Sequence, residues 1–391
     1  MALAVPSRTA EAWLDAELHR LRVEHPTAHE VGRRLVGVRI PLLVAFGAAV
    51  ATAVDVTIGS TNDMPTFVAA GHVLASGHPW SALADPSVQV GPLTLLVVEL
   101  AGLLAAIVGV SAAIGATAAL GALSTYAALH VARDTRPLAG RAAVLRDVGV
   151  GTTVVLGPVA VAALFGQLAE LLVALVLVAA GQLAVRGRDG AAGAIVGLSV
   201  ALKLWGVLGL PVLLLAARPR ALAVRAAAFV AVVGFAFLPF FAAGDMNSFA
   251  FRWTVNPDTP LGLLDAGADF GWPFRVAQGV LALAVGVALA RRPYAEPWMV
   301  VGGAIAVRLL TDPACYPYYG AALVCCLLVG LWPDLVDRWA WFWPVSLAVS
   351  IALTVGDYLA IHTLRGLPRD LLLVGALVWL FRTSGSAARD R

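Results

Sequence analysis

Long apolar runs, separated by short arginine-rich connectors, recur along the whole chain of 391 residues and limit what it can fold into. Hydrophobic residues make up 60% of the chain and charged residues only 13%, whereas a typical soluble domain has about 25% charged residues. In lipid, backbone groups must be paired internally, and helices meet that demand within a single segment. The sequence therefore predicts an all-α, polytopic integral membrane protein of about 10–12 transmembrane helices.

The arginines predict how the chain is oriented. Arg33, Arg34 and Arg39 precede the first expected span, residues 40–54, which predicts a cytoplasmic N-terminus. The later basic connectors follow the same rule and predict a multi-pass protein of the inner (plasma) membrane with both termini cytoplasmic. The net charge of +3 is spread over these connectors and forms no single patch, so we expect no nucleic acid partner. The three cysteines form no CxxC motif, and no cleavable signal peptide is expected.

Hydropathy and charge divide the chain into three parts. Residues 1–36 predict a cytoplasmic amphipathic arm, with Leu14, Leu18 and Leu21 at helical spacing. Residues 37–220 form a first transmembrane module that includes a periplasmic loop at 55–95. Residues 221–391 form a second module, with periplasmic loops at 244–272 and 308–319.

Two segments do not fit simple spans. Residues 91–131 are long enough for two spans, but the flanking charges require an odd number of crossings. Residues 191–217 have basic connectors at both ends, so they must cross an even number of times in a short length. Broken or re-entrant helices satisfy both cases. Gly206, Gly209 and Pro211 are the expected break in the second segment, and Gly91-Pro92 in the first.

The first predicted periplasmic loop contains two acids, Asp55 and Asp63, and two histidines, His72 and His78. Apolar residues recur at helical spacing from Met64 to Ser76, which predicts a short helix lying in the membrane interface. An ordinary solvated loop is the alternative.

Lys203 is the only lysine in the chain and lies within an apolar run. A cation at bilayer depth is costly, by about 2.5–3.5 kcal/mol on insertion scales, so we expect it to pair with an anion inside the protein. That anion is either a structural partner such as Glu170 or Glu99, or a phosphate held in a cavity.

Other polar residues reach the same predicted face. Gln167 and Glu170 are three residues apart and share one side of a helix. Arg252 lies in the 244–272 loop. Arg308 lies four residues before Asp312, ahead of an aromatic run. A simple interfacial ion pair and an aromatic belt of Tyr316, Tyr318 and Tyr319 are the alternatives there.

These motifs carry a resemblance. The segment Asn62-Asp63 through Gly77-His-Pro-Trp80, the Gly166-Gln167 turn, and Gly193 through Pro211 with Lys203 resemble the ordered signature of GT-C glycosyltransferases. More narrowly, they resemble family 87, the polyprenyl-phosphate-mannose-dependent mannosyltransferases of actinobacteria. The chain departs from the family pattern where Trp205-Gly206 replaces the proline after the lysine. The resemblance covers roughly residues 38–220.

The resemblance implies an inverting enzyme that moves a sugar from a polyprenyl-phosphate carrier to a hydroxyl of a lipid or glycan acceptor at the periplasmic face. Mannose is the first candidate for that sugar. One carboxylate is needed as base, and fixed cations stabilise the departing phosphate. Asp63 is the first candidate for the base and Asp55 the second. The candidates for substrate and carrier-phosphate binding are Lys203, Arg308, His72, His78, Gln167 and Arg252.

Neither a cofactor nor a metal is expected, and membrane lipid is an expected partner. A transporter or flippase for a lipid-linked or anionic substrate would also account for broken helices and a buried lysine. It predicts two similar halves, and no repeat relates residues 40–220 to 221–382. A structural subunit is a third reading, disfavoured by the intramembrane charge.

Overall fold

The computed structural model describes residues 63–386 except 139, 245, 266, 315, 333–341 and 356–361, together with scattered residues between 16 and 52. Within these residues the chain is mostly helical with almost no strand, which confirms the all-α class. Asp55, most of the arm over 1–36 and most of the first expected span lie outside the described residues.

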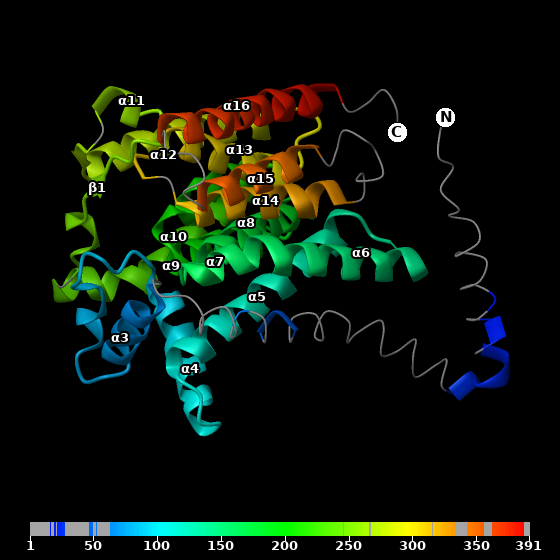
Figure 1. Ribbon diagram of the computed structural model, residues 1–391, viewed down its shortest axis with the longest axis horizontal. Coiled ribbons are helices and arrows are strands. Elements are labelled where there is room, and N and C mark those ends of the chain that lie inside the picture. The colour runs from blue at the N-terminus through cyan, green and yellow to red at the C-terminus, as the bar shows by residue number, and fades with distance from the viewer. Residues whose placement is uncertain are drawn as a thin grey trace.

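The elements follow one another in a simple order (Figure 1). The α-helices are α3 (Met64–Leu74), α4 (Pro92–Ile107), α5 (Ala112–Thr135), α6 (Gly140–Val154), α7 (Ala160–Leu164), α8 (Leu168–Val185), α9 (Asp189–Leu202), α10 (Pro219–Ala243), α11 (Gly262–Asp265), α12 (Trp272–Ala290), α13 (Pro297–Leu310), α14 (Pro317–Leu331), α15 (Phe342–Val355) and α16 (His362–Ser386). The shorter elements are the 3₁₀ helices η1 (Pro79–Leu83), η3 (Leu204–Leu214) and η4 (Ser248–Ala250), the π-helical turn η2 (Val155–Val159), and the strands β1 (Trp253–Thr254) and β2 (Asp269–Phe270).

Five helical segments in the described part are long and apolar enough to cross a membrane: α5, α8, α10, α12 and the stretch Ala142–Leu164 that runs from α6 into α7. Several shorter helices, among them α9, α13 and α14, are also apolar. This supports an integral membrane protein. The total of about 10–12 spans stays a prediction.

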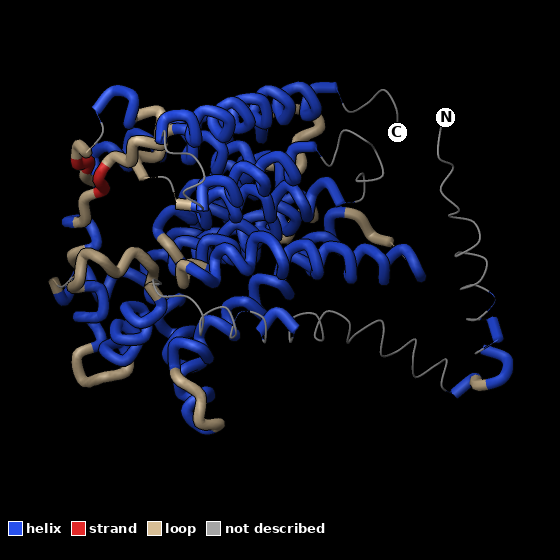
Figure 2. The backbone as a smooth tube through the Cα atoms, in the orientation of Figure 1, coloured by secondary structure: helices blue, strands red, loops and turns tan. Residues whose placement is uncertain are grey.

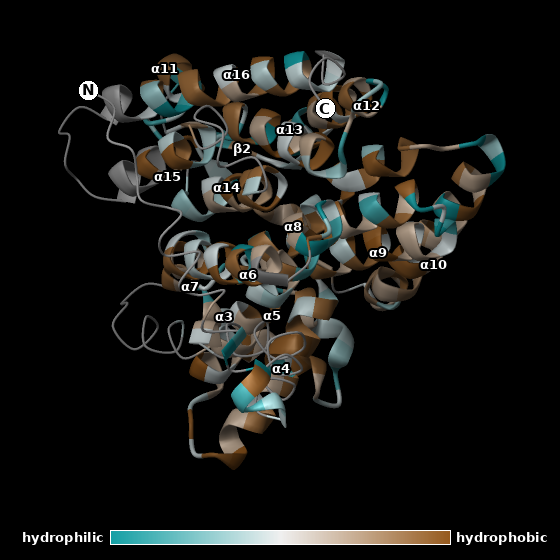
Figure 3. Ribbon diagram, turned by 90° about the vertical axis from the view of Figure 1, so that its right-hand side faces the viewer, coloured by the Kyte–Doolittle hydropathy of each residue, from teal (hydrophilic) through white to brown (hydrophobic). Residues whose placement is uncertain are grey.

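The buried core lies along α8, α13 and α14, whose residues are enclosed over nearly their whole length. By contrast, most residues of α10 and α12 are exposed or only partly buried, including large exposed apolar ones such as Phe235 and Leu238 of α10. Figure 3 shows hydrophobic residues spread along the helices of the bundle. A helix that is apolar all round is typical of a lipid-facing position.

The long loops gather at one end of the bundle, the end that also carries α3 (Figure 2). The loop between α10 and α12 contains the only strands of the described chain, an antiparallel pair in which Trp253 faces Phe270 and Thr254 faces Asp269. The short helix expected between Met64 and Ser76 is present as α3, and its position in the membrane interface stays a prediction.

The segment over 191–217 is a broken pair, as its charges predict. Helix α9 ends at Leu202, Lys203 has an extended backbone (φ −158°, ψ 135°), and η3 begins at Leu204. The buried Arg225 binds both ends of the pair, Asp189 at the start of α9 and the Leu213 carbonyl near the end of η3. The pair therefore enters and leaves the bundle at the same end. An eleven-residue 3₁₀ helix is unusually long, because 3₁₀ runs of more than about 3–4 residues are uncommon.

The position of the break differs from the one expected at Gly206, Gly209 and Pro211. The break falls at Lys203, and the two glycines serve packing instead. A Cβ at Gly206 would lie 2.5 Å from the Ser199 backbone, and one at Gly209 would lie 2.0 Å from Leu177. Glycine is therefore required because η3 turns back closely against α9 and α8.

Helix α4 ties the first loop to this break. The Leu202 carbonyl, freed where α9 ends, accepts hydrogen bonds from the Gly91 N–H and the Thr94 hydroxyl, each at 2.7 Å. These bonds satisfy an orphan carbonyl of the helix terminus. Beyond this point α4 projects away from the bundle before the chain returns as α5 (Figure 1). Of this hairpin, only α5 has the length and composition of a span.

Candidate functional site

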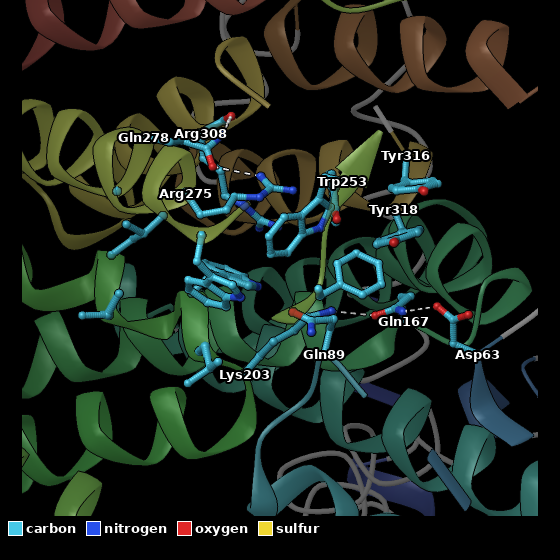
Figure 4. A pocket seen from close by; sticks show the side chains of 18 of the residues that line it. Asp63, Gln89, Gln167, Lys203, Trp253, Arg275, Gln278, Arg308, Tyr316 and Tyr318 are labelled. Carbon is cyan, nitrogen blue, oxygen red and sulfur yellow. Dashed lines mark hydrogen bonds between the residues drawn. The ribbon is translucent and has the colours of Figure 1, made fainter. Parts of the chain in front are cut away.

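A cavity of about 690 Å³ opens at the end of the bundle where the long loops gather. Its wall is built from the residue before α3, the first loop at Ser87 and Gln89, the turn before α8, the break between α9 and η3, the loop between α10 and α12, and the facing ends of α12, α13 and α14. Figure 4 shows the side chains that point into it. Segments from both predicted modules therefore meet in one place.

Asp63 immediately precedes α3 and is held against the turn between α7 and α8. Its backbone N–H donates to the Phe165 carbonyl at 3.1 Å. Gly166, which follows Phe165 in this turn, has a positive φ of 67°, and a Cβ there would lie 2.7 Å from the Met64 nitrogen. Only glycine allows this close approach. The Asp63 carboxylate makes no capping bond to α3; it accepts a hydrogen bond from the Gln167 amide instead.

Gln167 joins Asp63 to the buried lysine. The Gln167 Oε1 accepts a hydrogen bond of 2.6 Å from Lys203 Nζ, and the same Nζ lies 2.8 Å from Glu170 Oε1. Gln167, Glu170 and Lys203 are all buried. Of the two structural partners expected for Lys203, Glu170 is the one found, whereas Glu99 lies 2.6 Å from His72 on α3.

Glu170 also binds a second cation. Arg308 Nη1 of α13 lies 3.1 Å from Glu170 Oε2, so one carboxylate pairs with two cations. The Arg308 guanidinium lies over the rings of Tyr319 and Trp205, at 4.4 and 4.9 Å from their centroids. Such contacts stabilise a desolvated cation. Arg308 is thereby fixed in the cavity wall.

Arg275 of α12 completes the cationic wall. Its Nη1 lies 2.7 Å from Asp312 Oδ2 and 2.9 Å from Gln278 Oε1. The predicted pair of Arg308 and Asp312 is present at 3.8 Å, but Asp312 is closer to Arg275.

The arrangement separates the charges by position. Lys203, Arg275 and Arg308 line the cavity together with Asp63, whereas Glu170 and Asp312 lie behind the wall and do not line it. A ligand in the cavity therefore meets three cations and one carboxylate. Low-dielectric surroundings strengthen such fixed charges.

Aromatic side chains supply much of the remaining surface, including Phe165, Trp253 and Trp272. Tyr316, which immediately precedes α14, stacks on Tyr318 with ring centroids 5.4 Å apart. Burial and the nearby negative charge of Asp63 raise the pKa of Tyr316, so its hydroxyl stays protonated at neutral pH and can donate a hydrogen bond.

Three of the predicted binding residues are not brought to the cavity. His72 is largely exposed and pairs with Glu99. His78 and Arg252 are exposed, and neither lines the cavity. Asp55 lies outside the described residues. Among the residues that the structure describes, no group of three or more histidine, cysteine, aspartate or glutamate side chains is placed to hold a metal ion.

Sequence reasoning missed Arg275 and Gln89, which both line the cavity. A signal for Arg275 was present, because it and Gln278 lie three residues apart near the start of an otherwise apolar helix. Gln89 carried no comparable signal. Gln89 reaches the cavity because the first loop contacts the loop between α10 and α12, where the Gln89 amide donates to the Ser248 carbonyl at 3.1 Å.

Comparison of the chain with models of known protein families, with curated proteins and with solved structures finds no match.

Proposed function

We propose that the protein is an inverting glycosyltransferase of the GT-C type, which moves a sugar from a polyprenyl-phosphate carrier to a hydroxyl of a lipid or glycan acceptor. Mannose is the first candidate for that sugar. The single observation that carries the proposal is the cavity wall, where three cations line the cavity together with one carboxylate, Asp63. The order of Asp63, Gln167 and Lys203 along the resembling motifs agrees with their hydrogen-bonded chain.

The cations suit the carrier's phosphate. Lys203 and Arg308 are held by Glu170 from behind, so their positions are set before a ligand arrives. Preorganised cations stabilise charge that develops on a leaving group without further rearrangement. Arg275 adds a third positive charge to the same wall.

Asp63 is the candidate base. In the proposed step the acceptor oxygen attacks the anomeric carbon of the sugar and forms the new carbon–oxygen bond. The bond from that carbon to the phosphate oxygen breaks, and its electron pair leaves with the phosphate. The acceptor proton passes to the Asp63 carboxylate. Attack opposite the leaving group inverts the anomeric carbon. Phosphate leaves readily, so no general acid is required.

The aromatic residues suit the sugar. Trp253 and Trp272 offer apolar faces of the kind that pack against the C–H faces of a pyranose, and Trp272 is fixed by a hydrogen bond of 2.8 Å from its Nε1 to the Ser248 carbonyl. Fixed rings place a bound sugar without a large loss of side-chain entropy.

The charge distribution supports a cavity on the outer, periplasmic face. Helices α8 and α12 and the 3₁₀ helix η3 all begin at the cavity, and the connectors at their far ends carry the arginines Arg186, Arg188, Arg218, Arg291 and Arg292. Under the positive-inside rule those connectors are cytoplasmic.

A transporter or flippase of a lipid-linked anion is the second candidate, because a discontinuous helix pair with a cation at its break is typical of transporters. One experiment distinguishes the glycosyltransferase from the transporter. Purified protein is incubated with polyprenyl-phosphate mannose, labelled in the sugar, and a hydroxyl acceptor. The proposal expects a labelled product with an inverted anomeric carbon. No product with any polyprenyl-phosphate sugar, together with movement of the intact lipid across proteoliposomes, would favour the transporter.

A further inference from the structure

Two nitrogen donors in the cavity wall have no hydrogen-bond partner. They are the indole Nε1 of Trp205, in η3, and the guanidinium Nε of Arg275, in α12. Both atoms are closed off from water in the empty protein. A buried donor without a partner costs about 1–3 kcal/mol, and native proteins leave few such groups.

The remaining contacts of these two residues are well formed. Arg275 binds Asp312 and Gln278 through Nη1, and its guanidinium lies 4.3 Å from the Trp253 ring centroid. The Trp205 ring lies under Arg308 at 4.9 Å. Loose packing therefore does not explain the two unpaired nitrogens.

Two other tryptophans of this chain have a paired indole donor. Trp272 Nε1 donates to the Ser248 carbonyl at 2.8 Å, although Trp272 lines the same cavity. Trp298 Nε1, near the other end of α13, donates to Glu296 at 2.8 Å. Trp205 differs from both in having no acceptor within reach.

The two unpaired donors indicate which kind of ligand group could bind them. Trp205 Nε1 and Arg275 Nε can only donate, so their partner must be an acceptor. Arg308 lies over the Trp205 ring and Arg275 lines the same cavity, and the positive charge of both favours an acceptor with negative charge. A phosphate group provides several oxygens that meet both demands.

We propose that Trp205 and Arg275 form an oxyanion-binding subsite, in which Trp205 Nε1 and Arg275 Nε donate to the oxygens of a bound phosphate. This rests on the proposed function only in placing a phosphate in the cavity. Trp205 and Arg275 both line the cavity, and in the proposed complex each side chain turns so that its buried N–H reaches the phosphate. The subsite lies at the end remote from Asp63, and Figure 4 shows Arg275 and Asp63 on opposite sides of the cavity.

The proposal predicts that Trp205→Phe weakens phosphate binding without lowering the stability of the empty protein. In the empty protein the change removes an unpaired donor and keeps an aromatic ring under Arg308, so the melting temperature stays the same or rises. In the bound protein it removes a hydrogen bond to a charged group, which weakens phosphate binding about tenfold.

The experiment measures the melting temperature of the purified full-length protein in detergent, alone and with farnesyl phosphate, inorganic phosphate or farnesol. Trp205→Phe is compared with Trp298→Phe, which loses a satisfied indole bond far from the cavity. Trp298→Phe should lower the melting temperature of the empty protein and leave the response to farnesyl phosphate intact. Arg275→Lys, which keeps a cation beside Asp312 but removes Nε, should weaken the same response as Trp205→Phe.

A Trp205-dependent response to farnesyl phosphate alone identifies a lipid-linked phosphate, and an equal response to inorganic phosphate identifies a free one. The subsite is contradicted if Trp205→Phe destabilises the empty protein as Trp298→Phe does and leaves the response to both phosphates unchanged. It is also contradicted if farnesol acts as strongly as farnesyl phosphate. None of these readings depends on sugar transfer, so a failure of the proposed function would be recognised separately.

Discussion

Glu170 and Lys203 form a buried ion pair, with 2.8 Å between Glu170 Oε1 and Lys203 Nζ. The other oxygen of the same carboxylate binds Arg308, which lies 138 residues away in the chain. One acid of α8 thus fixes the two cations proposed to receive the phosphate, and it does so from behind the cavity wall.

Glu170→Gln should therefore destabilise the protein strongly, because it leaves two buried cations without their shared anion. Breaking a buried pair costs about 3–5 kcal/mol. Thermal denaturation in detergent measures the loss. Asp134→Asn is the matched control, since it removes an exposed pair with Arg186 and should cost no more than about 1 kcal/mol. Equal melting temperatures for the two variants would contradict the central role of Glu170.

Lys203→Met should weaken binding of a polyprenyl phosphate about tenfold or more, because it removes a charged donor from the cavity wall. Lys203→Arg keeps the cation and should retain more of the affinity. Binding is measured by titrating the purified variants with the carrier lipid. A Lys203→Met protein that unfolds, and whose surviving fraction binds the carrier normally, would show that Lys203 serves only the structure.

Gln167 links Asp63 to Lys203, so it is a positioning residue. Gln167→Leu should lower kcat by up to about 100-fold through loss of alignment, with a small change in KM. Steady-state kinetics separate the two constants. A rise in KM at unchanged kcat would place Gln167 in substrate binding instead.

Topology can be tested with single cysteines in a background that lacks the three native ones. Ser76 and Leu264 are exposed at the loop-rich end, and Arg292 is exposed in the connector between α12 and α13. A membrane-impermeant thiol reagent added to intact cells should label Ser76→Cys and Leu264→Cys but not Arg292→Cys. The reverse pattern would place the cavity on the cytoplasmic side.

Much of the local structure could be predicted from the sequence because its causes are local. The apolar spacing after Asp63 predicts α3, and the cost of a lone buried cation predicts a partner for Lys203. The break within 191–217 follows from charges at both ends. Its position was missed because Gly206 and Gly209 serve close packing between η3 and its neighbours, which depends on tertiary contacts.

The composition of the cavity was harder to predict for the same reason. Arg308 has an acid four residues away in sequence, yet its closer carboxylate is Glu170 of another helix. Arg275 reaches the site because α12 packs beside η3 and α13. His72 lies in the resembling first loop but pairs with Glu99 on α4 and does not line the cavity, a result that helical spacing alone does not determine.

The most direct test of the account is the rate of sugar transfer by Asp63→Asn in a single turnover at matched carrier occupancy. The variant keeps the shape of the side chain but removes the base, so the account predicts a loss of about 10²–10⁴-fold with little change in carrier affinity. Asp85→Asn is the control, because Asp85 lies in an exposed turn where it accepts from Ser87 and should be nearly silent. A near-normal rate for Asp63→Asn would contradict the assignment of Asp63 as the base; if Asp55→Asn then lost the activity, Asp55 would take that role.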